Sequence, residues 1–272
     1  MTAATLAAGA VVGLSLGLTG GGGAIFAVPL LVYGIGVDPR TAVSISLVTV
    51  AATALVGAVE RWRYGQVEFP TGLLFAASGM LAAPLGGWLG TLVPEPLLLS
   101  GFAALMLLIA VRMWAKSADP TERASPATLV AGSGPACRRD PEGKLRMTSR
   151  CASVLTATGL AVGLLSGLFG VGGGFLIVPA LVTFASMGVP RAVGTSLLVM
   201  TLVGAAGVAG QVAAGNGIPL DIAGGFVVGS IPGLLAGSFI GRRFTGPLLA
   251  KIFAVAIVGV ATFIIAKTFL AF

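Results

Sequence analysis

Apolar residues occur in long runs along this chain, and short clusters of charged residues separate the runs. Residues 1–37 and 151–190 carry no charged side chain. Each stretch is too long for one membrane-spanning helix, which needs about 20 residues, and each is interrupted by glycines and a proline. The pattern predicts a helix, a non-helical glycine turn and a short second helix in each stretch. The expected helices cover about 3–19 and 24–36 in the first stretch, and about 152–169 and 174–187 in the second.

Six further runs are long, apolar and nearly free of charge. They are Thr41–Val59, Phe69–Val93, Pro96–Val111, Ala192–Gly210, Ile222–Gly241 and Pro247–Ala266. Helices of this kind satisfy all their backbone hydrogen bonds internally, which a chain inside a bilayer requires. The sequence therefore predicts an all-α polytopic membrane protein with about eight to ten transmembrane segments.

The sequence contains an internal repeat with an offset of 150 residues. The run Gly20-Gly21-Gly22-Gly23 through Pro29 returns as Gly170-Val171-Gly172-Gly173-Gly174 through Pro179. From Gly13/Gly163 to Leu47/Leu197, 15 of 35 aligned pairs are identical. This indicates two homologous halves, 1–115 and 151–272, each with a broken helix at a glycine turn. Other glycines recur every four residues, a spacing that lets helices approach closely; they are 13/17, 163/167, 86/90 and 233/237/241.

The composition indicates an integral membrane protein. The 272 residues are 56% hydrophobic and 9% charged, with a mean hydropathy of +1.04, whereas a soluble domain carries about 25% charged residues. The net charge of +7 does not indicate nucleic-acid binding, because no basic stripe interleaves with aromatic residues. No cofactor or metal is predicted. The two cysteines, Cys137 and Cys151, follow no recognisable spacing and are expected as free thiols.

The stretch 116–150 is the exception to the apolar pattern. It holds seven basic residues against four acidic ones, with proline, glycine and serine among the rest. We interpret it as a linker between the halves of a multi-pass membrane protein, and its basic excess predicts a cytoplasmic location.

Two topologies fit the short helices. If they re-enter, each half has four spans and the halves are parallel. If they cross, each half has five spans and the halves are inverted. The second case places Arg61, Arg63, Arg191, Arg242 and Arg243 on the linker's side, and Asp38, Arg40 and Glu95 on the other. It obeys the positive-inside rule better, and we prefer it.

The glycine turns offer a binding chemistry. Each precedes a short helix, whose first N–H groups have no internal partner and lie at the positive end of the helix dipole. Such a site holds an anion without a cationic side chain. Nearby hydroxyls supply further donors, and Ser46 and Ser196 align in the repeat. The candidate substrate-binding residues are Thr19, Gly20, Gly21, Gly22, Gly23, Ser46, Gly170, Gly172, Gly173, Gly174 and Ser196.

Other functions fit less well. The turns are not a nucleotide loop, because no GKS or GKT motif follows. A hydrolase needs a nucleophile–base pair or a metal site, and it fits poorly because the chain has no histidine and its acidic residues are expected near the ends of the spans, so we do not predict an enzyme. Proton coupling would have to use Asp38, Glu60, Glu68 or Asp221. An anion channel or a lipid-phosphate flippase would use the same backbone site and stays an alternative.

At these turns the chain resembles the TauE/SafE family of sulfite exporters, also called the toluene-sulfonate uptake permease family. The resemblance rests on the two glycine runs with their prolines, and on 42–46 and 192–196; it covers nearly the whole chain. Pro179-Ala180-Leu181 departs slightly from Pro29-Leu30-Leu31. The resemblance implies a secondary transporter that moves sulfite, an organosulfonate or a similar sulfur anion across the bacterial cytoplasmic (inner) membrane. The expected partners are that anion and the lipid bilayer, with no nucleic acid; a homo-oligomer is left open.

Overall fold

The structure is a computed structural model. It describes residues 3–118, 138–139, 145–146, 149–170, 172–185, 187–215, 217, 219–241, 258–259 and 262. Most of the linker, Arg242, Arg243 and most of the predicted helix Pro247–Ala266 lie outside these residues.

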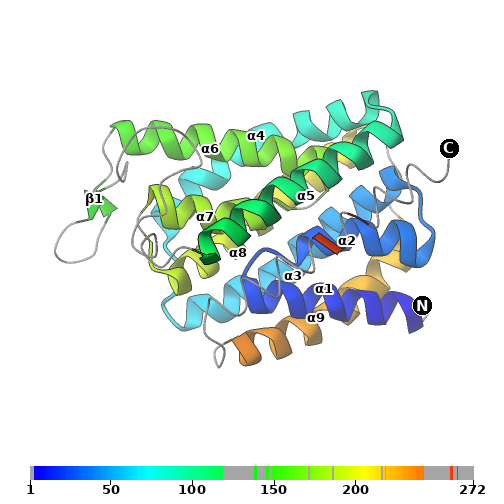
Figure 1. Cartoon of the computed structure of the whole chain (residues 1–272), viewed down its shortest axis with the longest axis horizontal. Helices are drawn as coiled ribbons and strands as arrows, with labels where there is room; N and C mark the ends of the chain where they lie inside the picture. The colour runs from blue at the N-terminus through cyan, green and yellow to red at the C-terminus, as the bar shows by residue number, and fades with distance from the viewer. Residues whose placement is uncertain are drawn as a thin grey trace.

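The described chain is a bundle of helices with one pair of two-residue strands (Figure 1). The first half contains α1 (Ala3–Thr19), α2 (Ala24–Pro29), the π-helical segment η1 (Leu30–Ile35), α3 (Pro39–Arg63), α4 (Phe69–Leu92) and α5 (Glu95–Ala118). Strands β1 (Arg138–Arg139) and β2 (Leu145–Arg146) pair antiparallel between the halves. The second half contains α6 (Ser149–Phe169), α7 (Gly174–Phe184), α8 (Val189–Ala213) and α9 (Leu220–Gly241).

Local sequence explains where several helices begin. Asp38 lies at the N-cap of α3, where its carboxylate accepts a hydrogen bond of 2.8 Å from the amide of Thr41. Pro39 follows at the first turn, where a missing N–H costs nothing. Pro29 ends the regular part of α2, and the chain continues as η1. The predicted helices within the described residues are confirmed, with ends that differ by a few residues.

Each helix before a glycine turn packs along a helix of the other half. Helix α1 contacts α9, and Cβ atoms at Gly9, Gly13 and Gly17 would overlap the carbonyl oxygens of 226, 230 and 234. Helix α6 contacts α4 in the same way, through Gly159, Gly163 and Gly167 against 75, 79 and 83. The predicted role of the four-residue glycine spacing is confirmed: these glycines let two backbones touch.

Helices α3 and α8 occupy equivalent places in the two halves and pack against each other in opposite directions. The Cβ position of Gly57 lies 3.0 Å from the side chain of Leu197, and that of Gly207 lies 3.3 Å from Leu47. An early residue of one helix thus meets a late residue of the other at both ends of the contact. Their facing sides form the centre of the molecule, where Leu47, Val50 and Met200 are fully buried.

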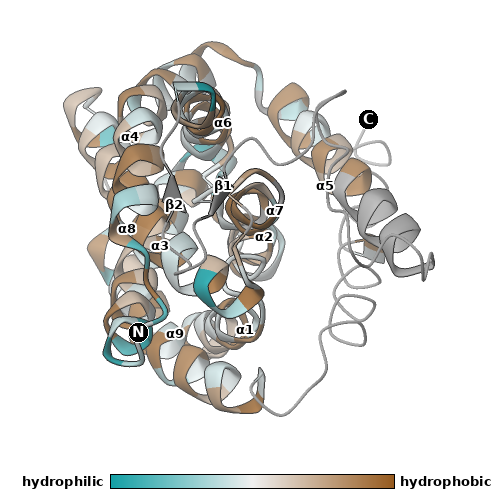
Figure 2. Cartoon of the chain, turned by 90° about the vertical axis from the view of Figure 1, so that its left-hand side faces the viewer, coloured by the Kyte–Doolittle hydropathy of each residue, from teal (hydrophilic) through white to brown (hydrophobic). Residues whose placement is uncertain are grey.

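The outer faces of the bundle are apolar. Among the described residues, five helices are long and apolar enough to cross a membrane: Pro39–Arg63, Phe69–Leu92, Ser149–Phe169, Val189–Ala213 and Leu220–Gly241. On α4, the exposed side chains include Leu81, Leu85 and Trp88, and Figure 2 shows hydrophobic residues along the outside of α4 and α8. Outward-facing hydrophobic side chains on long helices fit contact with lipid. The chain is a multi-pass membrane protein.

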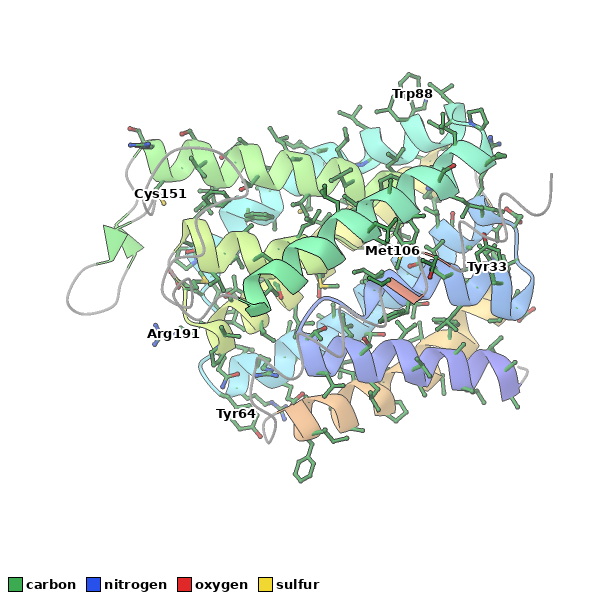
Figure 3. The ribbon with its side chains drawn as sticks, in the orientation of Figure 1. Tyr33, Tyr64, Trp88, Met106, Cys151 and Arg191 are labelled. Carbon is green, nitrogen blue, oxygen red and sulfur yellow. The ribbon has the colours of Figure 1, made fainter. Side chains whose placement is uncertain are left out.

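Charged residues gather at the two ends of the bundle. Figure 3 shows Tyr64, Cys151 and Arg191 at one end, and Tyr33 and Trp88 at the other. Arg61 belongs to the first end, because the Cβ position of Gly194 lies 3.2 Å from the Arg61 Cβ. We call this the linker end, since α6 begins there.

The expectation of free thiols is wrong for Cys151, which is disulfide-bonded. The spacing of the two cysteines in the sequence gave no indication that either forms a disulfide. Cys137 lies outside the described residues.

Candidate anion site at the glycine turns

The two glycine turns meet each other at the centre of the molecule. A Cβ atom at Gly21 would overlap the backbone of Gly174, and one at Gly174 would lie 2.6 Å from the Cα of Gly21. Gly20, Gly21, Gly172 and Gly174 are all buried. In this structure the turns are therefore closed on each other, and a substrate held between them requires them to move apart.

The backbone of both turns needs glycine. Gly20 has a φ of 72°, and Gly170, Gly172 and Gly173 have φ values of 67°, 65° and 68°. A side chain on a residue in this left-handed region is strained. The surroundings leave no room either, because a Cβ at Gly170 would lie 2.7 Å from the Cα of Val43. The turns are thus fixed by conformation and by close approach together.

Two serines hold the turns through bonds that cross between the halves. The hydroxyl of Ser46 donates to the carbonyl of Gly170 at 2.5 Å. The hydroxyl of Ser196 lies 2.6 Å from the carbonyl of Gly20 and 2.8 Å from the carbonyl of Val193 in its own helix, and it can donate to either. Both serines are fully buried. A hydroxyl has a single proton to donate, and each of the two serines donates its proton to a backbone carbonyl of the protein. Ser46 and Ser196, predicted from the sequence to bind substrate, thus form a reciprocal clamp on the glycine turns in this structure; their role in binding substrate stays a prediction.

Thr19 closes the first turn internally. Its hydroxyl donates to the carbonyl of Ser15 at 2.8 Å and accepts from the amide of Gly22 at 2.9 Å. The amide of Gly20 donates to the carbonyl of Leu16 at 2.7 Å. Of the candidate residues in this turn, Thr19, Gly20 and Gly22 thus use their protons within the protein.

The other amides of the two turns have no hydrogen-bond acceptor among the described residues. Within the described part of the chain, no hydrogen bond is made by the amides of Gly21 and Gly23 in the first turn, or of Gly172, Gly173 and Gly174 in the second. The last of these begins helix α7, and the first N–H groups of a helix have no partner inside it. These amides are the donors that an anion would meet.

Sequence reasoning missed one polar residue beside the second turn. Ser166 is fully buried on α6, and its Cβ lies 3.5 Å from the Cβ position of Gly173. Its hydroxyl has no hydrogen-bond partner. The repeat offered no signal for Ser166, because the aligned residue in the first half is Leu16.

The remaining hydroxyls near the turns have partners within the protein. Thr49 and Thr201 donate to carbonyls of their own helices at 2.8 Å. Ser44 also donates within its helix, to the carbonyl of Arg40 at 3.4 Å. These three contacts are the back-bonding that such side chains make inside helices. Thr195 instead accepts from the amide of Glu68 in the other half at 2.9 Å.

The carboxylates considered for proton coupling lie near helix ends. Ser238 donates to the carboxylate of Glu60 at 3.1 Å, and Thr71 donates to that of Glu68 at 2.9 Å. No cluster of three histidine, cysteine, aspartate or glutamate side chains that could hold a metal ion occurs among the described residues.

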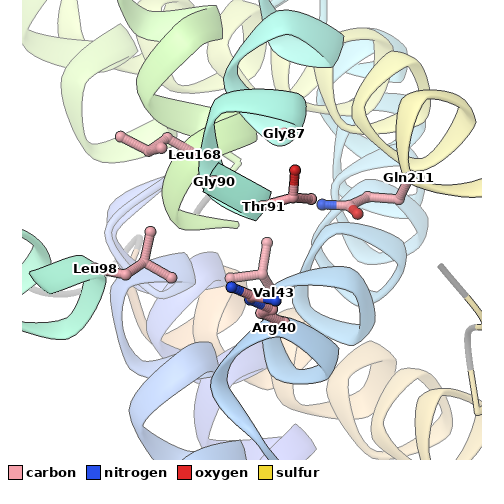
Figure 4. A pocket seen from close by; sticks show the side chains of 8 residues that line it. All are labelled: Arg40, Val43, Gly87, Gly90, Thr91, Leu98, Leu168 and Gln211. Carbon is pink, nitrogen blue, oxygen red and sulfur yellow. The ribbon is translucent and has the colours of Figure 1, made fainter. Parts of the chain in front are cut away.

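A pocket lies beside the second turn, at the end of the bundle opposite the linker (Figure 4). Its cavity volume is about 20 Å³, which is room for about one water molecule. Its lining residues are Arg40, Val43, Gly87, Gly90, Thr91, Leu98, Leu168 and Gln211. Val43 also contacts Gly170, so one side chain separates the pocket from the second turn. Arg40 supplies a positive charge to the pocket, and Thr91 and Gln211 supply polar groups.

Comparison with known proteins places the chain in a family. The sequence profile described as "Sulfite exporter TauE/SafE" matches residues 5–264. The chain belongs to the TauE/SafE sulfite exporter family. No solved structure matches it.

Curated relatives of this TauE/SafE protein carry transporter names. A "Probable membrane transporter protein" of Xylella fastidiosa (strain 9a5c) is 35% identical over 269 residues, covering 96% of this chain and 94% of the relative. The "Probable membrane transporter protein YdhB" of Bacillus subtilis (strain 168) is 27% identical, covering 89% of each chain. Family and relatives together identify this TauE/SafE protein as a membrane transporter.

Proposed function

We propose that this protein is a secondary transporter that moves a small sulfur-containing anion, such as sulfite or an organosulfonate, across the bacterial inner membrane. The observation that carries the proposal is the meeting of two buried glycine turns, each with some amides that have no acceptor among the described residues. Amides grouped at a helix start favour an anion. A site at the contact between two halves is where alternating access would expose and close it.

The arrangement of the helices supports inverted repeats. The equivalent helices α3 and α8 pack antiparallel. In addition, α2 and η1 turn back along α1: the Cβ position of Gly23 overlaps the backbone of Leu16, and Tyr33 lies at the end where the chain begins (Figures 1 and 3). We propose that rocking of the halves parts the turns and opens the site to one side at a time. The linker end, which holds Arg61, Arg63 and Arg191, faces the cytoplasm in this proposal.

The pocket at the opposite end provides an approach to the second turn. The Arg40 guanidinium in its lining attracts an anion, and the cavity, at about 20 Å³, must widen before a sulfonate can enter. Movement of Val43, which lies between the pocket and Gly170, would connect the two.

The test is anion flux through the purified protein in liposomes. Wild-type protein should carry sulfite or benzenesulfonate, and Gly172→Ala should reduce the flux at least about tenfold. The alanine is strained at a φ of 65° and collides with Val50. In the same assay, Arg40→Gln should raise the anion concentration that gives half-maximal flux.

The matched control is Gly36→Ala. Gly36 has a φ of 81°, so the backbone strain is similar, but nothing lies within 4 Å of its Cβ position. This variant should keep most of the flux. Equal flux in wild type and Gly172→Ala would remove the glycine turns from the transport path. Movement of a labelled lipid phosphate, without any sulfur-anion flux, would instead support the flippase alternative.

A further inference from the structure

The hydroxyl of Ser166 is an unexplained feature of the core. It is fully buried and has no hydrogen-bond partner. A buried hydroxyl without a partner is less favourable than one that is hydrogen-bonded. Other buried hydroxyls close to the site, such as those of Ser46, Thr49 and Ser196, all donate to carbonyls. Ser166 thus carries a free donor next to the turn at Gly173.

The same turn supplies the neighbouring donors. The amides of Gly172, Gly173 and Gly174 have no acceptor among the described residues, and the last begins α7, a helix of 11 residues. The surrounding groups are apolar: the Cβ position of Gly172 is 3.5 Å from Met200, and that of Gly173 is 2.6 Å from Val162. Donors in such surroundings attract an anion more strongly than they would in water.

The first turn lacks this combination. The residue aligned with Ser166 is Leu16, which has no donor in its side chain. Thr19 occupies the amide of Gly22 at 2.9 Å, whereas the aligned residue in the second half is Phe169, which cannot accept that bond. The repeat is therefore unequal at the site: the first turn keeps only the amides of Gly21 and Gly23 without an acceptor among the described residues, whereas the second keeps three amides and the Ser166 hydroxyl.

We propose that the oxyanion binds to the second turn, with the Ser166 hydroxyl and the amides of Gly172, Gly173 and Gly174 as its donors, and that the first turn acts as the moving cover. The inference rests on the proposed function, since it names the half that holds the transported anion. It gives Ser166 the role of a substrate-binding residue. Ser46 and Ser196 then position the turns and leave the anion to Ser166.

The test uses Ser166→Ala in the full chain, purified in detergent. Without ligand, its melting temperature should equal or exceed that of the wild type, because the alanine buries no unpaired donor. Stabilisation by sulfite and by benzenesulfonate should require at least about tenfold more anion, as expected for a lost hydrogen bond to a charged group. The matched control is Ser78→Ala, which removes a buried hydroxyl that donates to the carbonyl of Phe75 at 2.8 Å; it should bind both anions as the wild type does.

The results distinguish the role of Ser166 from the proposed function of the protein. Unchanged anion binding by Ser166→Ala would overturn the role of Ser166, and a marked fall in its melting temperature would do the same by pointing to a structural partner. Either result leaves the proposed function to the flux of Gly172→Ala. Wild-type protein that neither binds nor carries any sulfur anion would overturn the proposed function and this inference together.

Discussion

At the scale of single residues, the clamp made by Ser46 and Ser196 is the feature that most directly ties the halves together. Replacing either serine with alanine removes one hydrogen bond to a turn carbonyl in the other half. We expect each variant to lose about 1 kcal/mol of stability, because the buried carbonyl keeps no equivalent partner. Thermal unfolding of the purified protein measures this. Sulfite flux should fall as well, since the turn that the serine positions becomes looser.

Ser44→Ala is the control for the clamp. The Ser44 hydroxyl donates to the carbonyl of Arg40 in its own helix at 3.4 Å and makes no bond between the halves. Its loss should leave both the melting temperature and the flux close to wild type. If Ser44→Ala and Ser46→Ala behaved alike, the contacts between the halves would not be what stabilises the turns.

The sequence could identify Ser46 and Ser196 but not their partners. The repeat aligned the two serines, and their position after the turns suggested a role there. Their acceptors lie 124 and 176 residues away along the chain, and no local pattern encodes such a distance. Ser166 was missed for a related reason: alignment of the halves emphasises shared residues, and Ser166 differs from Leu16.

At the scale of helices, stability depends on backbone contacts that only glycine allows. Gly163 on α6 lies against the backbone of Gly79 on α4, and an added Cβ would overlap the Gly79 carbonyl. Gly163→Ala should therefore cost about 1–3 kcal/mol through overpacking. Gly224→Ala on α9, where nothing lies within 4 Å of the Cβ position, should be neutral or slightly stabilising. Comparison of the two melting temperatures checks this, and equal values would contradict close packing of α4 on α6.

The periodicity of the sequence predicted these helices and their glycine faces, but not which helices meet. A glycine every four residues indicates that a helix has a narrow side. It does not say that α1 packs on α9 of the other half or α6 on α4, because an apolar sequence matches many partners equally well. The packing of helices of one half against helices of the other half is seen only in the structure.

At the scale of the whole molecule, the positions of the loops predict the side on which each is exposed. Tyr64 lies at the linker end (Figure 3), and its side chain is 58% exposed. Gly217 is exposed between α8 and α9, at the end that holds Gln211 and the pocket. In a variant with both native cysteines replaced by serine, a maleimide that cannot cross membranes should label Gly217→Cys in intact cells. It should label Tyr64→Cys only after the membrane is opened. This follows because basic loops stay in the cytoplasm, and Arg61, Arg63 and Arg191 lie at the same end as Tyr64.

The reverse labelling pattern would mean that the protein has the opposite orientation in the membrane, with the pocket that contains Arg40 on the cytoplasmic side. Labelling of both cysteines in intact cells would refute opposite exposure of the two ends, and with it the proposal that the halves are inverted across the bilayer.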